Sequence, residues 1–278
     1  MIEILGLQLF LAVLATVALT AAASGAGLRM RYREERVWRV VPTLTALFLV
    51  LNTVLLVWRA VQVSDARHVL ANRFDLTLLF ATTVTVVAFH SQLRPAIRGL
   101  DTFVLPVALF IQVLSFLGMK EPQLPGSIRS WFVVHQISFV LGATFLVYGG
   151  VAGGAYLLLS RVLRNKQTSS LLWRMAPLEA WERSGRWGLL FGFLSITFGV
   201  LTGICQASRL EETTSREWVT DGFIVACIVV WVLYAIGMAA TWIVPRFRGR
   251  RSAQLAVASG IMLMVVFLII EQLSVVHR

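Results

Sequence analysis

The sequence returns again and again to apolar runs of about 20 residues, and this feature restricts the fold more than any other. A run of that length, wound as an α-helix, crosses a hydrocarbon core of about 30 Å. Because lipid offers no hydrogen bonds to the backbone, a spanning segment must be a helix or part of a closed barrel. Runs this long, without polar alternation, exclude the barrel. They predict an all-α integral membrane protein.

The composition supports the same class of fold. Of the 278 residues 58% are hydrophobic and 14% are charged, and the mean hydropathy is +0.78. A soluble domain of this length needs far more polar surface. We therefore expect one polytopic domain over residues 1–278, a bundle of about eight transmembrane helices. The apolar spans lie at about residues 4–25, 38–60, 74–92, 102–118, 131–159, 186–206, 222–245 and 254–275.

The basic residues predict the orientation of the spans, because cytoplasmic loops retain Lys and Arg during insertion. About 17 of the 25 basic residues lie in alternate connections. These connections cover residues 29–39, 94–98, 161–186 and 246–251. We expect those loops in the cytoplasm and both termini on the outer side of a bacterial inner (cytoplasmic) membrane.

The formal net charge of +11 does not indicate nucleic-acid binding, because the basic residues are spread over short loops between spans. Retention of topology and attraction to the anionic headgroups of the lipid bilayer explain it better. A transporter is disfavoured, because the sequence shows no obvious intramembrane pair of acidic and basic residues. Small residues at helical spacing, Gly149, Gly150, Gly153 and Gly154, predict close helix packing.

Two of the four histidines are candidates for cofactor binding. His135 is expected about one turn into the fifth span from its outer end, and His277 just past the last span on the same side. Neutral imidazole is a good ligand for haem iron, and two imidazoles at one depth would give a six-coordinate site. For either residue the alternative is a polar side chain at the membrane interface. We interpret His90 and Glu271 as interfacial residues.

The outer loop before the seventh span offers an indole beside a carboxylate, Trp218 and Asp221. An indole forms a flat apolar platform with a hydrogen-bonding edge, which suits one face of a porphyrin. The alternative is an ordinary tryptophan of the interfacial aromatic belt.

These features, in this order, resemble the cytochrome c assembly protein family, which includes CcsA, ResC and HemX-like proteins. The resemblance rests on the segment from Ser130 to His135 that runs into Tyr148–Gly153, and on the segment from Phe198 to Gly203. It continues through Trp231–Ala235 to the loop Arg248–Arg251, and it covers most of the chain.

The resemblance implies a membrane-embedded haem-handling factor that holds and presents b-type haem on the outer face for cytochrome c assembly. Members carry a tryptophan-rich outer loop, the WWD domain, flanked by two outward-facing histidines. His135 matches the first histidine, His277 matches the second, and Trp218 and Asp221 fall within the loop. The implied partners are a CcsB (ResB)-like membrane protein and an apocytochrome c. The thiols of the apocytochrome would attack the haem, so this chain would be an accessory factor of a haem lyase rather than an enzyme.

The sequence also departs from the family pattern. Only Trp218 and Asp221 remain of the platform motif, and Ala239 stands where complete synthetases carry an intramembrane histidine. These losses keep an alternative open: a divergent HemX-like regulator or membrane scaffold that has lost full haem-lyase competence.

Overall fold

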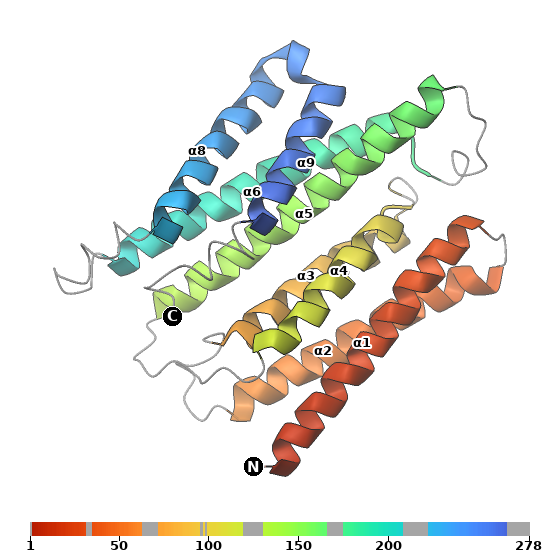
Figure 1. Ribbon diagram of the computed structural model, residues 1–278, viewed down its shortest axis with the longest axis vertical. Coiled ribbons are helices and arrows are strands. Elements are labelled where there is room, and N and C mark those ends of the chain that lie inside the picture. The colour runs from red at the N-terminus through yellow and green to blue at the C-terminus, as the bar shows by residue number, and fades with distance from the viewer. Residues whose placement is uncertain are drawn as a thin grey trace. The chain divides into compact units, whose positions relative to one another are not determined.

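A computed structural model gives the fold of the chain and shows a helical protein (Figure 1). It describes residues 2–31, 35–62, 72–94, 97, 99–118, 130–165, 175–207 and 222–265. The helices in these ranges are α1 (Ile2–Arg31), α2 (Glu35–Gln62), α3 (Arg73–Leu93), α4 (Asp101–Ser115), α5 (Ser130–Arg164), α6 (Leu178–Ala207), α8 (Gly222–Ile243) and α9 (Arg250–Val265). Two short 3₁₀ turns, η3 (Phe116–Gly118) and η5 (Pro245–Phe247), complete the described elements.

Seven of the described helices are long and apolar enough to cross a membrane, which is the architecture of a multi-pass helical membrane protein. Of the last predicted span, 254–275, the part up to residue 265 belongs to α9, and the rest lies outside the described residues. The helices also extend past the predicted apolar limits. For example, α5 has 35 residues and α6 begins at Leu178, because the backbone stays helical through the polar residues that flank each apolar run.

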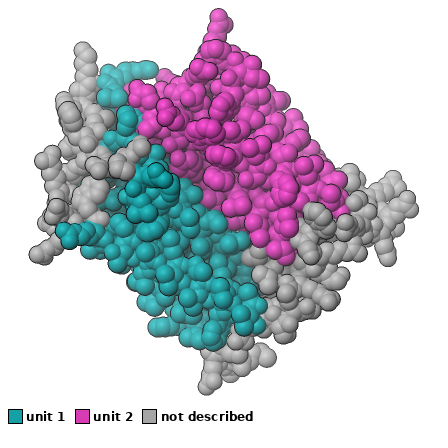
Figure 2. Space-filling model, turned by 180° about the vertical axis from the view of Figure 1, so that it is seen from behind, with its two compact units in different colours: residues 1–128, 162–177 teal, residues 129–161, 178–278 magenta. Residues whose placement is uncertain are grey.

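The helices fall into two compact units, which are coloured separately in Figure 2 and described here one at a time. Unit 1 contains α1 to α4, and unit 2 contains α6, α8, α9 and nearly all of α5. In each unit, large apolar side chains such as Phe10, Val50, Leu194 and Ile236 face outward, as expected of helices surrounded by lipid. A single domain over the whole chain stays a prediction.

Unit 1 is fastened at the two ends of α1 by buried ion pairs. At one end Arg29 pairs with Asp101 at the start of α4, and both side chains are almost completely buried. At the other end Arg59 of α2 pairs with Asp75 of α3, and its Nη1 also donates to Gln8 Oε1 of α1 at 3.0 Å. The first pair therefore ties α1 to α4, which are distant in sequence, and the second ties the consecutive helices α2 and α3 to each other and, through Gln8, to α1.

A third polar contact crosses the middle of unit 1. The Asn52 amide of α2 is fully buried and donates to Thr82 Oγ1 of α3 and to Gln112 Oε1 of α4, each at 3.1 Å. The two ion pairs were not visible in the sequence, because the partners of Arg29 and Arg59 come from other helices. All four residues lie in the first or last turn of their helices, so the pairs do not mark a path through the unit, and the prediction against a transporter stays a prediction.

Unit 2 is held by close contact of glycines, as the small-residue pattern of α5 predicts. A Cβ placed on Gly188 of α6 would lie 2.6 Å from Gly149 Cα, so α5 and α6 touch backbone to backbone. On the neighbouring face of α5, a Cβ on Gly153 would lie 2.6 Å from the Ala253 carbonyl oxygen of α9. The packing role is thus confirmed for Gly149, Gly150 and Gly153, whereas Gly154 has only an ordinary contact with Val257 at 3.9 Å.

The helix α8 is joined to α6 by two aromatic residues. Trp231 Nε1 donates to Thr197 Oγ1 at 2.9 Å, and the Tyr234 hydroxyl donates to the Leu189 carbonyl at 2.7 Å. The Phe193 ring of α6 lies between them, stacked on Trp231 with centroids 6.1 Å apart. The segment Trp231–Ala235, which carries part of the family resemblance, therefore fastens one helix to the next.

Candidate functional site

His135 lies near the beginning of α5, five residues after Ser130, and its side chain is half-buried in unit 2. The prediction placed it about one turn inside the span, and the helix boundary agrees. The second turn of a helix is close enough to a membrane surface for an imidazole to meet both a packed interior and an accessible ligand.

One hydrogen bond fixes the tautomer of His135. Its Nδ1 lies 2.8 Å from the carbonyl oxygen of Gly199 on α6. A carbonyl oxygen only accepts, so Nδ1 must carry the proton and donate. In the neutral ring the lone pair is then on Nε2, which is the nitrogen that can bind a metal. A metal-ligating histidine is usually oriented in this way, by a hydrogen bond from the ring nitrogen that does not bind the metal.

The ring of Phe139, one turn further along α5, supports the imidazole. The two ring centroids are 4.8 Å apart, and the rings are tilted by 56°. Phe139 in turn lies against Gly199, where an added Cβ would come within 2.7 Å of the Phe139 ring. The missing side chain at Gly199 is therefore what lets the α6 carbonyl reach His135 past Phe139.

The Gly199 carbonyl that accepts from His135 also accepts from a side chain of α6. Thr202 Oγ1 also donates to the Gly199 oxygen, at 2.9 Å, and to the Phe198 oxygen at 3.0 Å. A threonine hydroxyl in a helix commonly donates to a carbonyl oxygen three or four residues earlier in the same helix. His135, Phe139, Gly199 and Thr202 form what we call the His135 cluster.

The other predicted site residues are not described. His277, Trp218 and Asp221 all lie outside the described residues, as does Glu271, so the structure does not test their approach to His135. His90 is described; it is exposed at the end of α3, in agreement with an interfacial residue. Within the described ranges no three His, Cys, Asp or Glu side chains gather as a metal site.

Sequence reasoning found His135 but not the residues that orient it. Gly199 and Phe139 are 64 and 4 residues from His135, and neither carries a group that usually signals a site. The only feature of the sequence that pointed to Gly199 was the segment Phe198–Gly203. This segment carries part of the resemblance to the assembly family, but its residue types suggest no chemical role.

Comparison with known proteins adds nothing to this geometry, because no protein-family model, curated sequence or solved structure matches the chain significantly. The membership suggested by the motifs therefore has no independent support. A functional argument has to start from the His135 cluster itself.

Proposed function

We propose that the protein is a haem-handling factor for cytochrome c assembly, which holds haem on the outer face of a bacterial cytoplasmic membrane. The observation that supports this best is the hydrogen bond from His135 Nδ1 to the Gly199 carbonyl. It gives the imidazole the tautomer and orientation of an axial ligand.

In this proposal the chain binds and orients the cofactor, and it contributes no nucleophile. His135 and His277 would each supply a nitrogen ligand to the haem iron. Trp218 would pack on the porphyrin, and Asp221 would orient the outer loop or bond near a propionate. The haem would supply vinyl groups for the cysteine thiols of an apocytochrome c, and a CcsB (ResB)-like protein would be the membrane partner.

The half-buried position of His135 fits a haem ligand in two respects. Phe139 covers one side of the imidazole with an apolar ring, which lowers the access of water. The Gly199 carbonyl places partial negative charge next to Nδ1–H, which raises the basicity of the ligating nitrogen. Both effects favour a bound haem iron over a solvated side chain.

The first experiment compares absorption spectra of detergent-purified protein, oxidised and reduced. Wild type should show a Soret band and sharp reduced bands, which should weaken in His135→Ala and His277→Ala. His90→Ala is the matched control, because that histidine is exposed on α3, and its spectrum should equal the wild-type spectrum. A colourless wild type that stays colourless after haem addition would overturn the proposal.

A second variant tests the orienting contact rather than the ligand. Gly199→Ala keeps the carbonyl but pushes a Cβ into the Phe139 ring. The reduced bands should broaden or shift, because the imidazole is held less uniformly, while part of the haem is retained. Unchanged spectra would mean that the Gly199 contact has no bearing on a ligand.

The alternative is a HemX-like regulator or a scaffold that has lost haem-lyase competence. It is favoured by one position: Ala239 of α8, half-buried, stands where complete synthetases carry a histidine and offers no ligand. If the purified protein takes up no haem, this alternative replaces the first proposal.

A further inference from the structure

A pocket in unit 2 combines cationic and aromatic side chains far from His135 along α6. It has a volume of about 340 Å³ and is lined by Arg183, Arg186, Trp187, Trp242 and Arg248. The first three residues lie on the beginning of α6, Trp242 lies at the end of α8, and Arg248 lies in the turn before α9. By the distribution of basic residues, this end of unit 2 faces the cytoplasm.

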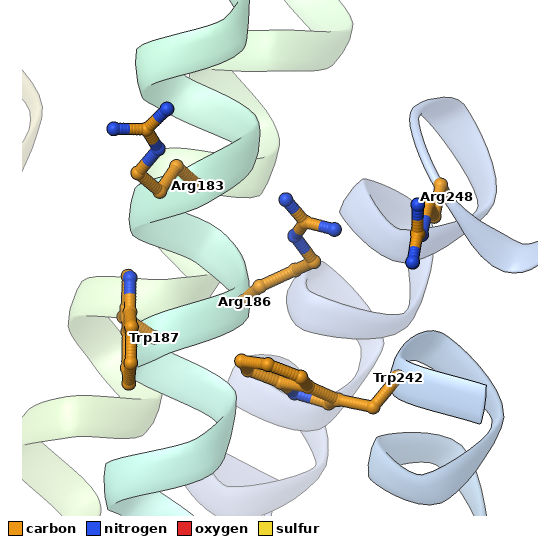
Figure 3. A pocket seen from close by; sticks show the side chains of 5 residues that line it. All are labelled: Arg183, Arg186, Trp187, Trp242 and Arg248. Carbon is orange, nitrogen blue, oxygen red and sulfur yellow. The ribbon is translucent and has the colours of Figure 1, made fainter. Parts of the chain in front are cut away.

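The side chains are layered by chemistry. Figure 3 shows the three guanidinium groups toward one end of the pocket and the two indole rings toward the other. The rings of Trp187 and Trp242 meet edge to face, with centroids 5.7 Å apart. Guanidinium groups are forked donors for phosphate oxygens, and indoles prefer the boundary between water and hydrocarbon.

Among the described residues that line the pocket there is no carboxylate. Glu182 of α6 accepts the backbone N–H of Gly249 at 3.0 Å. Its distance to Arg186 Nη1 is 3.9 Å, at the limit of an ion pair. The Gly249 backbone has φ of +66°, a left-handed turn that only glycine adopts easily and that sets the neighbouring Arg248 beside α6. The pocket therefore keeps a positive balance.

An apolar surface leads out of the pocket along α6. Trp187 is followed at helical spacing by exposed Phe191, Leu194, Phe198 and Leu201. Steps of three and four residues keep these side chains on one face of the helix, so they form a continuous stripe. A free phosphate has no use for such a stripe, whereas an acyl chain does.

We propose that this pocket binds the headgroup of an anionic phospholipid. Arg186, Arg248 and Arg183 take the phosphate oxygens, the two indoles pack on the glycerol region, and an acyl chain follows the α6 stripe. The ligand would anchor α6, α8 and the turn before α9 at one depth. This inference does not depend on haem binding.

The test measures lipid retention by native mass spectrometry of the full chain, released from detergent micelles that contain phosphatidylglycerol and phosphatidylcholine in equal amounts. Wild type should retain phosphatidylglycerol preferentially. Each pocket arginine is worth about fivefold in affinity for an anionic headgroup, so Arg248→Gln should weaken retention by about that factor, and Arg186→Gln with Arg248→Gln should abolish the preference.

The matched control is Arg246→Gln with Arg250→Gln, which removes the same amount of charge at two exposed positions outside the pocket, one in η5 and one at the first residue of α9. It should keep the wild-type preference. If the control variant loses the preference for phosphatidylglycerol to the same extent, the preference comes from general surface charge, and the proposed site is wrong. Arg248→Gln alone guards against misfolding, because the Arg248 side chain is exposed.

Inorganic phosphate distinguishes the two sources of the ligand chemistry. Added at millimolar concentration to lipid-depleted protein, phosphate should not raise the melting temperature, whereas phosphatidylglycerol should. Equal stabilisation by phosphate, lost in Arg248→Gln, would show a free-anion site and would overturn the lipid proposal. Retention of both lipids in equal amounts by wild type would also overturn it.

Discussion

The helices of the two units are held together by different kinds of contact. In unit 1 the helices are tied by charges and amides: an ion pair at each end of α1 and the Asn52 contacts between them. In unit 2 the helices approach until their backbones touch at glycines, and α8 is added through Trp231 and Tyr234. Since lipid tails are as apolar as leucine, helices in a membrane associate through just these two means, polar contacts and close packing.

The difference predicts different kinds of fragility. A polar fastening is lost all at once, because removal of one partner leaves the other buried and unsatisfied. A glycine contact is lost by degrees, because an added methyl group can be absorbed by a shift of the helix. The following variants test this contrast, and for each the free energy of unfolding is measured by titration with denaturing detergent in mixed micelles.

The largest effect is expected at the buried pair Arg29–Asp101. Arg29→Met alone should destabilise the protein by about 3–5 kcal/mol, because the Asp101 carboxylate stays buried without its partner charge. The double variant Arg29→Met with Asp101→Leu should recover most of that loss. If the double variant is as unstable as the single one, the loss comes from the missing ion pair and not from an unsatisfied carboxylate. The proposed reason why unit 1 is the more fragile unit would then be wrong.

The next effect belongs to the glycines of α5, which provide neighbouring test and control positions. Gly153→Ala should cost about 1–3 kcal/mol, because its Cβ would lie 2.6 Å from the Ala253 oxygen, a backbone atom that cannot turn away. Gly154→Ala meets nothing closer than Val257 Cγ2 at 3.9 Å and should be neutral. Equal results for the two variants would contradict the backbone contact between α5 and α9.

Hydrogen bonds without charge allow a direct comparison of the units. Asn52→Leu should cost about 1–2 kcal/mol, because it removes the donor to Thr82 and Gln112 together. Tyr234→Phe should cost about 0.6 kcal/mol, because it removes one bond to a helix carbonyl and keeps the ring packed against Phe193. The reverse order would show that unit 2 depends on its polar contacts more than unit 1 does.

The smallest effect is expected for Glu182→Gln, at the carboxylate that accepts the N–H of Gly249. Glu182→Gln keeps an acceptor oxygen and should stay within about 0.5 kcal/mol of wild type. Glu182→Ala removes the acceptor and should cost about 0.5–1.5 kcal/mol. A large loss in the glutamine variant would mean that the negative charge of Glu182 matters in its own right.

The sequence predicted the helices well, because each span is a local property of about 20 residues of composition. The glycines of α5 were also predictable, since their spacing alone places them on adjoining faces of one helix. The pairing of Arg29 with Asp101, 72 residues apart, was not, because it depends on which helices become neighbours.

In the candidate site too, the local feature was visible in the sequence and the contact between helices was not. His135 could be found from its residue type and its depth in a span. The Gly199 carbonyl that orients it is invisible to any analysis of side chains, because every residue has a carbonyl. The roles of His135, Trp218, Asp221 and His277 in a haem site all remain predictions.

The acceptor of the His135 hydrogen bond has a consequence for how such a protein can diverge. An orienting aspartate or asparagine is lost with its side chain, whereas a main-chain oxygen remains whatever residue carries it. Here the contact still requires a glycine at position 199, because a Cβ there would meet the Phe139 ring. The orientation of the imidazole thus depends on one small residue and on the alignment of α5 with α6. Distant relatives could retain a correctly aimed histidine while their sequences, read position by position, show almost nothing in common around it.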